Sequence, residues 1–220
     1  MSIEADTPMR LKRIVTKRSQ ENVYIYYNEE SRQGIVIDPG GEAEEIISFI
    51  QENQLTISYI LLTHGHFDHI MAVEDVKKAT NAPVVANVLE RNLLGDPSLN
   101  LSLKFHTPCS VKVDKALSEG DILSLGGVSL RAISTPGHTA GGMCFYVEEE
   151  GVLFSGDTLF HESVGRVDLP TSDGLALEKS LTKLFALIPD DTRVYPGHSR
   201  PTSIGHERVN NPYFTTNKSS

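Results

Sequence analysis

Residues 63–69 read Thr-His-Gly-His-Phe-Asp-His and directly follow an apolar run at residues 57–62. A nearly unbroken apolar strand is typical of a sheet that is buried on both faces, as when helices cover it. Imidazole and carboxylate groups bind divalent metals, and the glycine allows a tight turn that aims neighbouring side chains at one point. The chain must therefore fold so that one strand end presents a cluster of metal ligands. The candidates in this stretch are His64, His66, Asp68 and His69.

Three further candidate ligands each follow a predicted strand and stand directly after a glycine. They are His138 in Thr-Pro-Gly-His, Asp157 in Phe-Ser-Gly-Asp, and His198 in Tyr-Pro-Gly-His. Each alone is more typical of a turn, but together with the first motif they indicate ligands that converge on one edge of the fold. The seven candidates, none of them cysteine, exceed the four ligands of a closed structural zinc site and fit two adjacent metals with open positions. Such a pair can hydrolyse a substrate without a protein nucleophile, and the sequence has no nucleophile-elbow serine motif.

The hydrophobic pattern predicts strands followed by helices in both halves of the chain. In the first half we expect strands at residues 11–16, 23–27, 34–38, 57–62 and 83–86, helices at residues 43–53 and 68–79, and a helical turn at residues 88–94. Residues 95–109 lose the pattern and predict a long loop. In the second half we expect strands at residues 121–125, 128–133, 143–147, 152–154 and 193–195, and a helix at residues 174–187. This order predicts two β-plus-α layers packed sheet to sheet, with the helices outside.

Length and composition predict a single domain over residues 1–214 and a disordered tail at residues 215–220. The formal net charge of −9 disfavours nucleic acid as a partner, despite a short basic cluster between Arg10 and Arg18. No apolar run has the length of a signal peptide or a membrane span, so we expect a soluble, cytoplasmic protein with no membrane contact. The two cysteines form neither a disulfide framework nor a cysteine zinc site.

The order and spacing of these motifs resemble those of the metallo-β-lactamase superfamily over nearly the whole chain. Within it the sequence is most similar to the short glyoxalase II-like hydrolases. It departs from the full-length glyoxalase II enzymes in that the 22 residues after His198 are too few for the helical domain that holds glutathione there. The segments that carry this likeness are Asp38-Pro39-Gly40, Asn100-Leu101-Ser102, Gly156-Asp157-Thr158-Leu159-Phe160, Gly165-Arg166-Val167-Asp168-Leu169-Pro170, Ile204-Gly205-His206-Glu207-Arg208 and Asn211-Pro212-Tyr213. Ser199-Arg200 departs from the family's usual Gly-Pro at that place.

The resemblance implies an α/β fold of the αββα four-layer sandwich type with the metal site at one edge. It implies that His64, His66 and His138 bind a first metal, that Asp68, His69 and His198 bind a second, and that Asp157 bridges both. The cofactors would be two divalent ions, with zinc favoured and iron or manganese as alternatives. The sequence leaves the oligomeric state open.

The function expected from this resemblance is hydrolysis of a small-molecule thioester, such as S-lactoylglutathione, or of a related ester. A metal-bridging hydroxide would attack the carbonyl carbon, with Asp68 and Asp157 as the catalytic carboxylates. Arg166 is a candidate clamp for a substrate carboxylate, although a surface ion pair with Asp168 is an equal alternative. His161, four residues after the bridging aspartate, is a second candidate for substrate contact.

Three other functions fit parts of the same pattern. Persulfide dioxygenases share the fold and resemble this chain over the same motifs, and they would use one iron held by His64, His138 and Asp157. A non-catalytic metal-binding or interaction module is disfavoured, because the ligand set is intact. A β-lactamase activity is less favoured, because the closer likeness is to the glyoxalase II-like group.

Overall fold

The computed structural model describes residues 9–215, and over that range the chain forms two six-stranded sheets and a two-stranded ribbon. The first sheet has the order β1 (Met9–Val15), β2 (Asn22–Asn28), β3 (Gln33–Ile37), β4 (Thr56–Leu61), β5 (Val84–Asn87), β6 (Lys115–Leu117). The second has the order β14 (Thr202–Ser203), β13 (Arg193–Pro196), β10 (Val152–Gly156), β9 (Met143–Val147), β8 (Val128–Ser134), β7 (Ile122–Leu125). The ribbon pairs β11 (Leu159–Phe160) with β12 (Ser163–Val164).

Most helices lie in the connections between strands, and α6 and α7 follow the last strand. The helices are α1 (Ala43–Glu52), α2 (Phe67–Ile70), α3 (Val73–Thr80), the 3-10 turn η1 (Val88–Glu90), α4 (Arg91–Gly95), α5 (Gly174–Leu187), α6 (Ile204–Asn210) and α7 (Pro212–Thr215). The pairs β3–β4, β4–β5, β5–β6 and β10–β13 are parallel, so each needs a crossover. α1, α3 and α5 lie in the first, second and fourth of these crossovers, and η1 and α4 lie in the third. Along the described chain, no helix is long and apolar enough to cross a bilayer.

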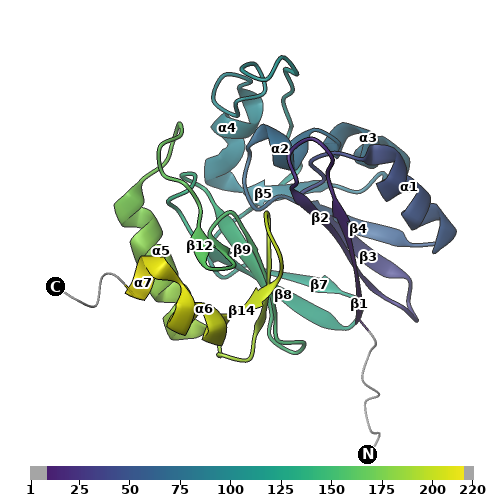
Figure 1. Ribbon diagram of the computed structural model, residues 1–220. Coiled ribbons are helices and arrows are strands. Elements are labelled where there is room, and N and C mark those ends of the chain that lie inside the picture. The colour runs from purple at the N-terminus through teal and green to yellow at the C-terminus, as the bar shows by residue number, and fades with distance from the viewer. Residues whose placement is uncertain (1–8, 216–220) are drawn as a thin grey trace, which may run out of the picture.

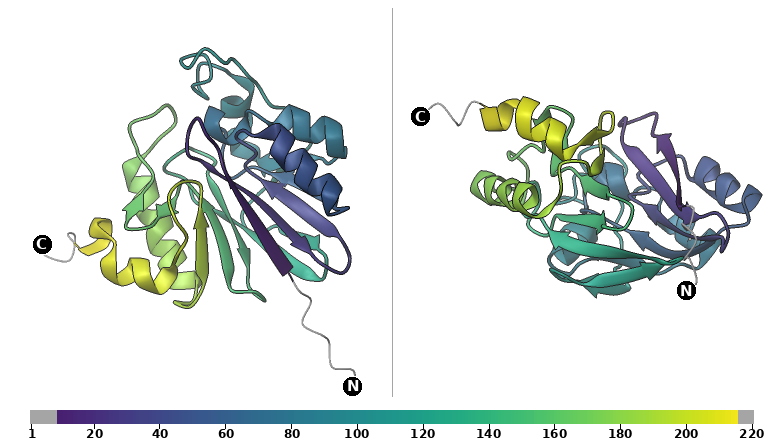
Figure 2. Two further views of the ribbon diagram at one scale, coloured as in Figure 1. Left: turned by 45° about the vertical axis from the view of Figure 1, so that its right-hand side comes forward. Right: turned by 90° about the horizontal axis from the view of Figure 1, so that it is seen from below.

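The two sheets pack face to face, and helices cover the outer face of each (Figure 1, Figure 2). Buried side chains form one cluster under α1 and α3, a second between the sheets, and a third under α5. Strand β2 shows how the sequence produces these layers, because its side chains alternate between faces. Val23 and Ile25 point to the helices, while Tyr24 and Tyr26 point to the other sheet. The result is the four-layer αββα sandwich that the sequence predicted.

The sequence predicted one continuous helix over residues 68–79, and this prediction is wrong because the helix is interrupted. The structure has two helices there, α2 and α3, with a bend at residues 71–72. The bend follows from packing against the end of β3, because the backbone N–H of Ala72 donates to the carbonyl oxygen of Pro39 at 2.9 Å. Gly40 lies so close that a Cβ there would be 1.6 Å from the carbonyl oxygen of Asp68.

Several short elements were not predicted, namely β6, β14, the β11–β12 ribbon and α7. Thr215, the first residue of the predicted disordered tail, is the last residue of α7. The rest of that tail, residues 216–220, lies outside the described residues. The predicted loop at residues 95–109 is confirmed from residue 96 onward, where no helix or strand is assigned.

Candidate metal centre

The first ligand motif occupies the loop between β4 and α2. His64, His66 and His69 are all buried there, with relative exposures of 2%, 2% and 0%. The backbone N–H of Gly65 donates to Glu90 at 2.9 Å, and a Cβ on Gly65 would lie 3.0 Å from the Leu94 side chain. The glycine therefore lets the loop pack tightly enough to turn its imidazoles inward.

The other candidates come from the second sheet and reach the same place. His138 lies between β8 and β9, Asp157 directly follows β10, and His198 follows β13. The glycine before His198 is required by space, because a Cβ on Gly197 would lie 2.3 Å from Asp157 Oδ1 and 2.6 Å from His69 Cε1. This is the close approach that the glycine–ligand pattern in the sequence predicted.

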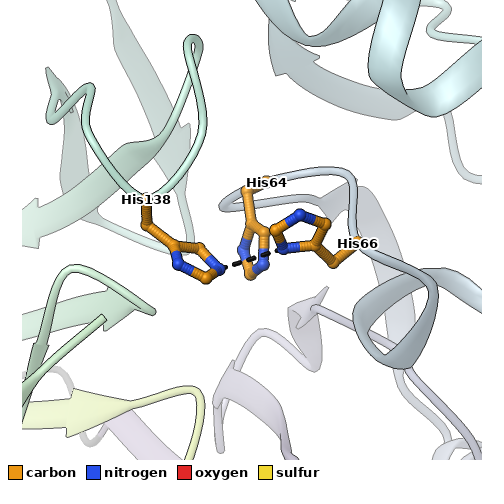
Figure 3. A group of neighbouring side chains, drawn as sticks. All are labelled: His64, His66 and His138. Carbon is orange, nitrogen blue, oxygen red and sulfur yellow. Dashed lines mark hydrogen bonds between the residues drawn. The ribbon is translucent and has the colours of Figure 1, made fainter. Parts of the chain in front are cut away.

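His64, His66 and His138 form the first ligand group (Figure 3). One candidate ligand atom from each lies within 4.8 Å of the other two. His66 Nδ1 and His138 Nε2 are 3.0 Å apart, and the three ring centroids are separated by 4.7 to 4.9 Å. The three rings, which come from two different sheets, thus face one common point.

Asp68, His69 and His198 form the second ligand group, also with candidate ligand atoms within 4.8 Å of one another. His198 Nε2 lies 3.2 Å from Asp68 Oδ2. His198 is the more exposed member, since 28% of its side chain is accessible, whereas His69 is fully buried. The second group therefore borders solvent on one side.

Asp157 lies between the two groups. Its Oδ1 is 3.4 Å from His69 Nε2, and its Oδ2 is 3.5 Å from His138 Nε2 and 3.7 Å from His198 Nε2. One carboxylate thus faces ligands of both groups, which is the position that a bridging ligand must occupy.

Unpartnered polar atoms show that the residues fit bound metal. Four buried atoms of the centre make no hydrogen bond, and they are His64 Nε2, His66 Nε2, His69 Nε2 and Asp157 Oδ1. Such atoms are costly to bury, and most in folded proteins have a partner. A divalent cation would supply that partner for imidazole nitrogens and a carboxylate together. The imidazole and carboxylate set suits zinc, iron or manganese alike.

Hydrogen bonds on the far side of three rings fix which nitrogen is free. Thr63 Oγ1 lies 3.1 Å from His64 Nδ1, Asp38 Oδ2 lies 3.0 Å from His69 Nδ1, and the Arg166 carbonyl oxygen lies 2.8 Å from His138 Nδ1. Each contact occupies Nδ1 and leaves Nε2 facing the centre. Outer partners of this kind orient metal-binding histidines and set their tautomer.

Asp38 and Glu90 are supporting residues that the sequence did not identify by function. Asp38 also accepts from Thr63, through its backbone N–H at 2.7 Å and its hydroxyl at 2.5 Å. Glu90 is 1% exposed and accepts from the backbone N–H of Gly65 at 2.9 Å and of Gly141 at 2.7 Å. It thereby ties the first ligand loop to the loop after His138. Asp38 had a weak local signal, as a polar residue that ends a buried strand, whereas nothing in the sequence marked Glu90.

A further carboxyl group, Glu21, lies behind the second group. It is 0% exposed, its Oε1 is 4.0 Å from His69 Nδ1, and neither oxygen has a hydrogen-bond partner. Burial raises the pKa of Glu21 well above its usual value, and the charge of His69 only partly opposes this shift. The carboxyl group is therefore held toward its neutral form.

The two ligand groups differ in their affinity for protons. Burial lowers the pKa of His64 well below its usual value and the pKa of His66 to about 3, and neighbouring histidines add to both shifts. Burial also acts to lower the pKa of His69, but the carboxylates of Asp157 and Asp38 outweigh it and raise that pKa well above normal. For His198, burial is likewise outweighed, chiefly by the hydrogen bond to Asp68, so its pKa is raised. His64 and His66 therefore offer neutral imidazoles, while His69 and His198 hold protons.

The centre forms the floor of a cavity of about 530 Å³. Apolar side chains line its walls, including Phe67 and Phe105, whose rings stack with centroids 4.4 Å apart. His66, Asp68, His138, Asp157 and His198 all face this cavity. A small organic molecule could thus reach both ligand groups at once.

The two predicted substrate contacts lie in different places. Arg166 lines the cavity and also pairs with Asp168 through two hydrogen bonds of 2.6 and 2.7 Å, so both alternatives considered for it are present together. His161 is not among the residues that line the cavity. Its ring stacks on that of His206 in a neighbouring hollow, with centroids 4.9 Å apart. Its Nε2 lies 2.8 Å from Arg200 Nη2.

Comparison with known proteins gives consistent similarities. A family model described as the metallo-β-lactamase superfamily matches residues 16–198. A probable metallo-hydrolase of Bacillus subtilis is 35% identical over 208 residues, covering 94% of this chain and 98% of that protein. A hydroxyacylglutathione hydrolase of Haemophilus influenzae is 32% identical over 214 residues, covering 94% of this chain and 99% of that protein.

Three solved structures superpose over most of both chains. The B3 metallo-β-lactamase BLEG-1 has a TM-score of 0.88 at 39% identity, covering 94% of this chain and 100% of that one. TTHA1623, solved in a di-iron-bound form, has a TM-score of 0.81 at 36% identity, covering 92% and 99%. ETHE1 from Myxococcus xanthus has a TM-score of 0.79 at 28% identity, covering 94% and 85%.

Proposed function

The chain belongs to the metallo-β-lactamase superfamily, and from that premise we propose that it is a metal-dependent hydrolase that cleaves thioesters such as S-lactoylglutathione. One observation carries the proposal, namely that Asp157 stands between two ligand groups at the floor of an apolar-walled cavity. Two metals with open positions, within reach of a bound acyl group, are what hydrolysis without a protein nucleophile requires. The likeness to a hydroxyacylglutathione hydrolase supports the thioester as substrate.

The reaction balances as a hydrolysis. A water oxygen bonds to the carbonyl carbon, the carbon–sulfur bond breaks, and the thiolate leaves and takes up a proton, giving a carboxylic acid and a thiol. Two divalent ions bound at the centre would polarise the carbonyl oxygen and make the attacking water more acidic. We assign zinc as the favoured ion, with iron or manganese as alternatives.

The chain's own residues position these parts. Asp157 orients His69 and His138 from one side, at 3.4 and 3.5 Å. Asp68 lines the cavity and is placed to accept the proton that the attacking water loses. The stacked rings of Phe67 and Phe105 supply an apolar wall beside the centre, which reduces the access of bulk water.

The test is a metal-reconstituted preparation assayed for thiol release from S-lactoylglutathione, together with the variant Asp157→Ala. We expect wild-type protein to bind about two ions per chain and to turn over the thioester, and we expect Asp157→Ala to lose bound metal and activity together. The matched control is Asp190→Ala, an exposed aspartate paired with Arg208 away from the centre, which should keep both. No turnover of any acyl-thiol by the reconstituted wild type would refute the proposed reaction. Full metal content and activity in Asp157→Ala would refute the site.

A persulfide dioxygenase is the second candidate function. His64, His138 and Asp157 could supply the two-histidine, one-carboxylate face of a single iron, and the likeness to a di-iron protein supports iron in this centre. Oxygen consumption with glutathione persulfide, measured beside thiol release from the thioester, separates the two reactions. A cephalosporin assay on the same preparation tests the β-lactamase activity that the name of BLEG-1 suggests.

A further inference from the structure

A separate group of candidate metal ligands lies outside the cavity of the metal centre. It consists of His161 and Glu162, in the turn of the β11–β12 ribbon, and His206, in α6. One candidate ligand atom from each lies within 4.8 Å of the other two. None of the three is among the residues that line the cavity, and His161 and His206 instead line a hollow of about 420 Å³. The proposed hydrolysis uses none of these side chains.

The three side chains already have nearly the spacing of ligands around one ion. Glu162 Oε1 lies 3.1 Å from His206 Nε2 and 3.6 Å from His161 Nε2. Imidazole and carboxylate ligands bind zinc at about 2.0–2.2 Å, which places tetrahedral ligand atoms roughly 3.3–3.6 Å apart. The two imidazole rings stack with their centroids 4.9 Å apart, and both Nε2 atoms face the same carboxylate oxygen. Little movement would therefore be needed to bind an ion.

A hydrogen bond shows which tutomer-determining role each nitrogen of His161 has. Arg200 Nη2 lies 2.8 Å from His161 Nε2, and a guanidinium can only donate. His161 Nε2 is therefore the acceptor and the proton lies on Nδ1, which is the tautomer that binds a metal through Nε2. An imidazole electron pair beside a carboxylate favours a cation, whereas an anion at the same point would be repelled by Glu162. Arg200 is exposed and can turn away into solvent.

A buried carboxylate fixes the ribbon against α6. Glu207 is 0% exposed, and its Oε2 accepts from the backbone N–H of Glu162 at 2.8 Å. Its Oε1 accepts from the hydroxyl of Thr202 at 2.5 Å. Because Glu207 follows His206 in α6, this contact holds both sides of the ligand group together, and Figure 1 shows β12 beside α6. Ligands on a fixed support lose less conformational freedom when an ion binds.

We propose that His161, Glu162 and His206 form a peripheral metal site for a borderline divalent ion, with zinc favoured and nickel or copper as alternatives. Three protein ligands leave the remaining positions to water. Arg193 and Arg200 bring positive charge to the same hollow, so the site should bind its ion more weakly than the main centre and exchange it with solvent. The bound ion would join the β11–β12 ribbon to α6. This inference does not depend on the proposed hydrolysis.

The experiment titrates zinc into full-length protein whose main centre is already loaded and from which excess ion has been removed. Calorimetry measures any further binding, and NMR of the histidine ring nitrogens identifies the imidazoles that take part. His206→Gln removes a ligand, whereas Arg200→Ala removes the competing donor and its charge. The matched control is His106→Asn, at an exposed histidine that belongs to none of the candidate ligand groups of the described chain and whose φ of 59° asparagine tolerates.

We expect wild-type protein to bind one further zinc ion, with shifted Nε2 resonances for His161 and His206. His206→Gln should weaken this binding roughly tenfold or more, since loss of even an outer partner of a ligand costs that much. Arg200→Ala should tighten it roughly two- to fivefold, because an exposed like charge is removed. His106→Asn should match wild type.

Three results would overturn the site. The first is a further ion that His206→Gln binds as tightly as wild type, and the second is no further ion in either wild type or Arg200→Ala. The third comes from a parallel titration with inorganic phosphate. If wild type binds phosphate but no further zinc, and Arg200→Ala binds neither, the hollow is an anion site rather than a metal site.

Discussion

Replacing Asp38 by asparagine tests whether a residue outside the ligand set controls the metal centre. Asp38 Oδ1 accepts from the backbone N–H of Thr63 at 2.7 Å, while its Oδ2 accepts from the Thr63 hydroxyl and lies 3.0 Å from His69 Nδ1. Asparagine can keep the first of these bonds with its carbonyl oxygen, but its amide N–H groups then face His69. The imidazole must turn its own proton to Nε2, which is the nitrogen that would bind metal.

The magnitude follows from the bonds that change. A hydrogen bond to a charged acceptor contributes roughly 1.5 to 3 kcal/mol, so the metal-free variant should lose about that much free energy of unfolding. Outer partners of metal-binding histidines typically change metal affinity by about 10- to 100-fold, or ~1.4 to 2.8 kcal/mol. Backbone strain adds little, because Asp38 has a φ of 47° and asparagine tolerates this left-handed region.

The assay is metal titration by calorimetry, with urea unfolding of the metal-free protein beside it. The larger loss of affinity should fall on the group that contains His69. Asp114→Asn is the matched control, since Asp114 also accepts a backbone N–H, from Val84 at 2.8 Å, and pairs with Lys77 far from the centre. If Asp38→Asn and Asp114→Asn both bind the two ions as tightly as wild type, then the Asp38 carboxylate does not set the tautomer of His69 in the way proposed.

Two further predictions concern the same centre. Because the pKa values of His69 and His198 are raised and that of His66 is lowered to about 3, metal binding at the second group should release more protons near neutral pH than binding at the first, where His64 and His66 are already neutral. On acidification the second group should therefore lose its ion first. Calorimetry in buffers of different ionisation enthalpy measures how many protons are released as each ion binds. Equal proton release for both ions would contradict the assignment. Gly197→Ala places a Cβ 2.3 Å from Asp157 Oδ1, so it should lower the metal content and cost about 1 to 3 kcal/mol of stability. The control is Gly95→Ala, whose Cβ would meet nothing within 4 Å and which should change neither the metal content nor the stability. Full metal content in Gly197→Ala, by elemental analysis, would show that the close approach is not required.

The sequence indicated which candidate ligands come together because its signals are local. The nearly unbroken apolar runs of β2 and β4 mark strands that are covered on both faces, and glycines mark the points where the chain must turn closely. His64, His138 and Asp157 each stand just after such a strand or turn. A reader of the sequence can therefore place them at strand ends without knowing the tertiary structure.

Features that depend on contacts across space could not be predicted in the same way. Strands β6 and β14 have three and two residues, too few to show a period, and they exist because β5 and β13 offer free edges to pair with. Glu90 has the sequence context of any surface turn, yet it is buried because two ligand loops meet over it. His161 is close to Asp157 in sequence, but the β11–β12 ribbon carries it away from the cavity.

The contact between the start and the end of the chain has a consequence for the order of folding. The backbone N–H of Asn22 donates to the carbonyl oxygen of Gly197 at 2.7 Å. The hydroxyl of Tyr24 donates to the carbonyl oxygen of Pro196, 172 residues away in sequence, also at 2.7 Å. Contacts of such separation form slowly and late, because a long loop must close before they contribute. His198 is seated beside these residues, so the second ligand group stays incomplete until they meet. During synthesis, therefore, we expect the nascent chain to acquire its second ion only after β13 has joined β10.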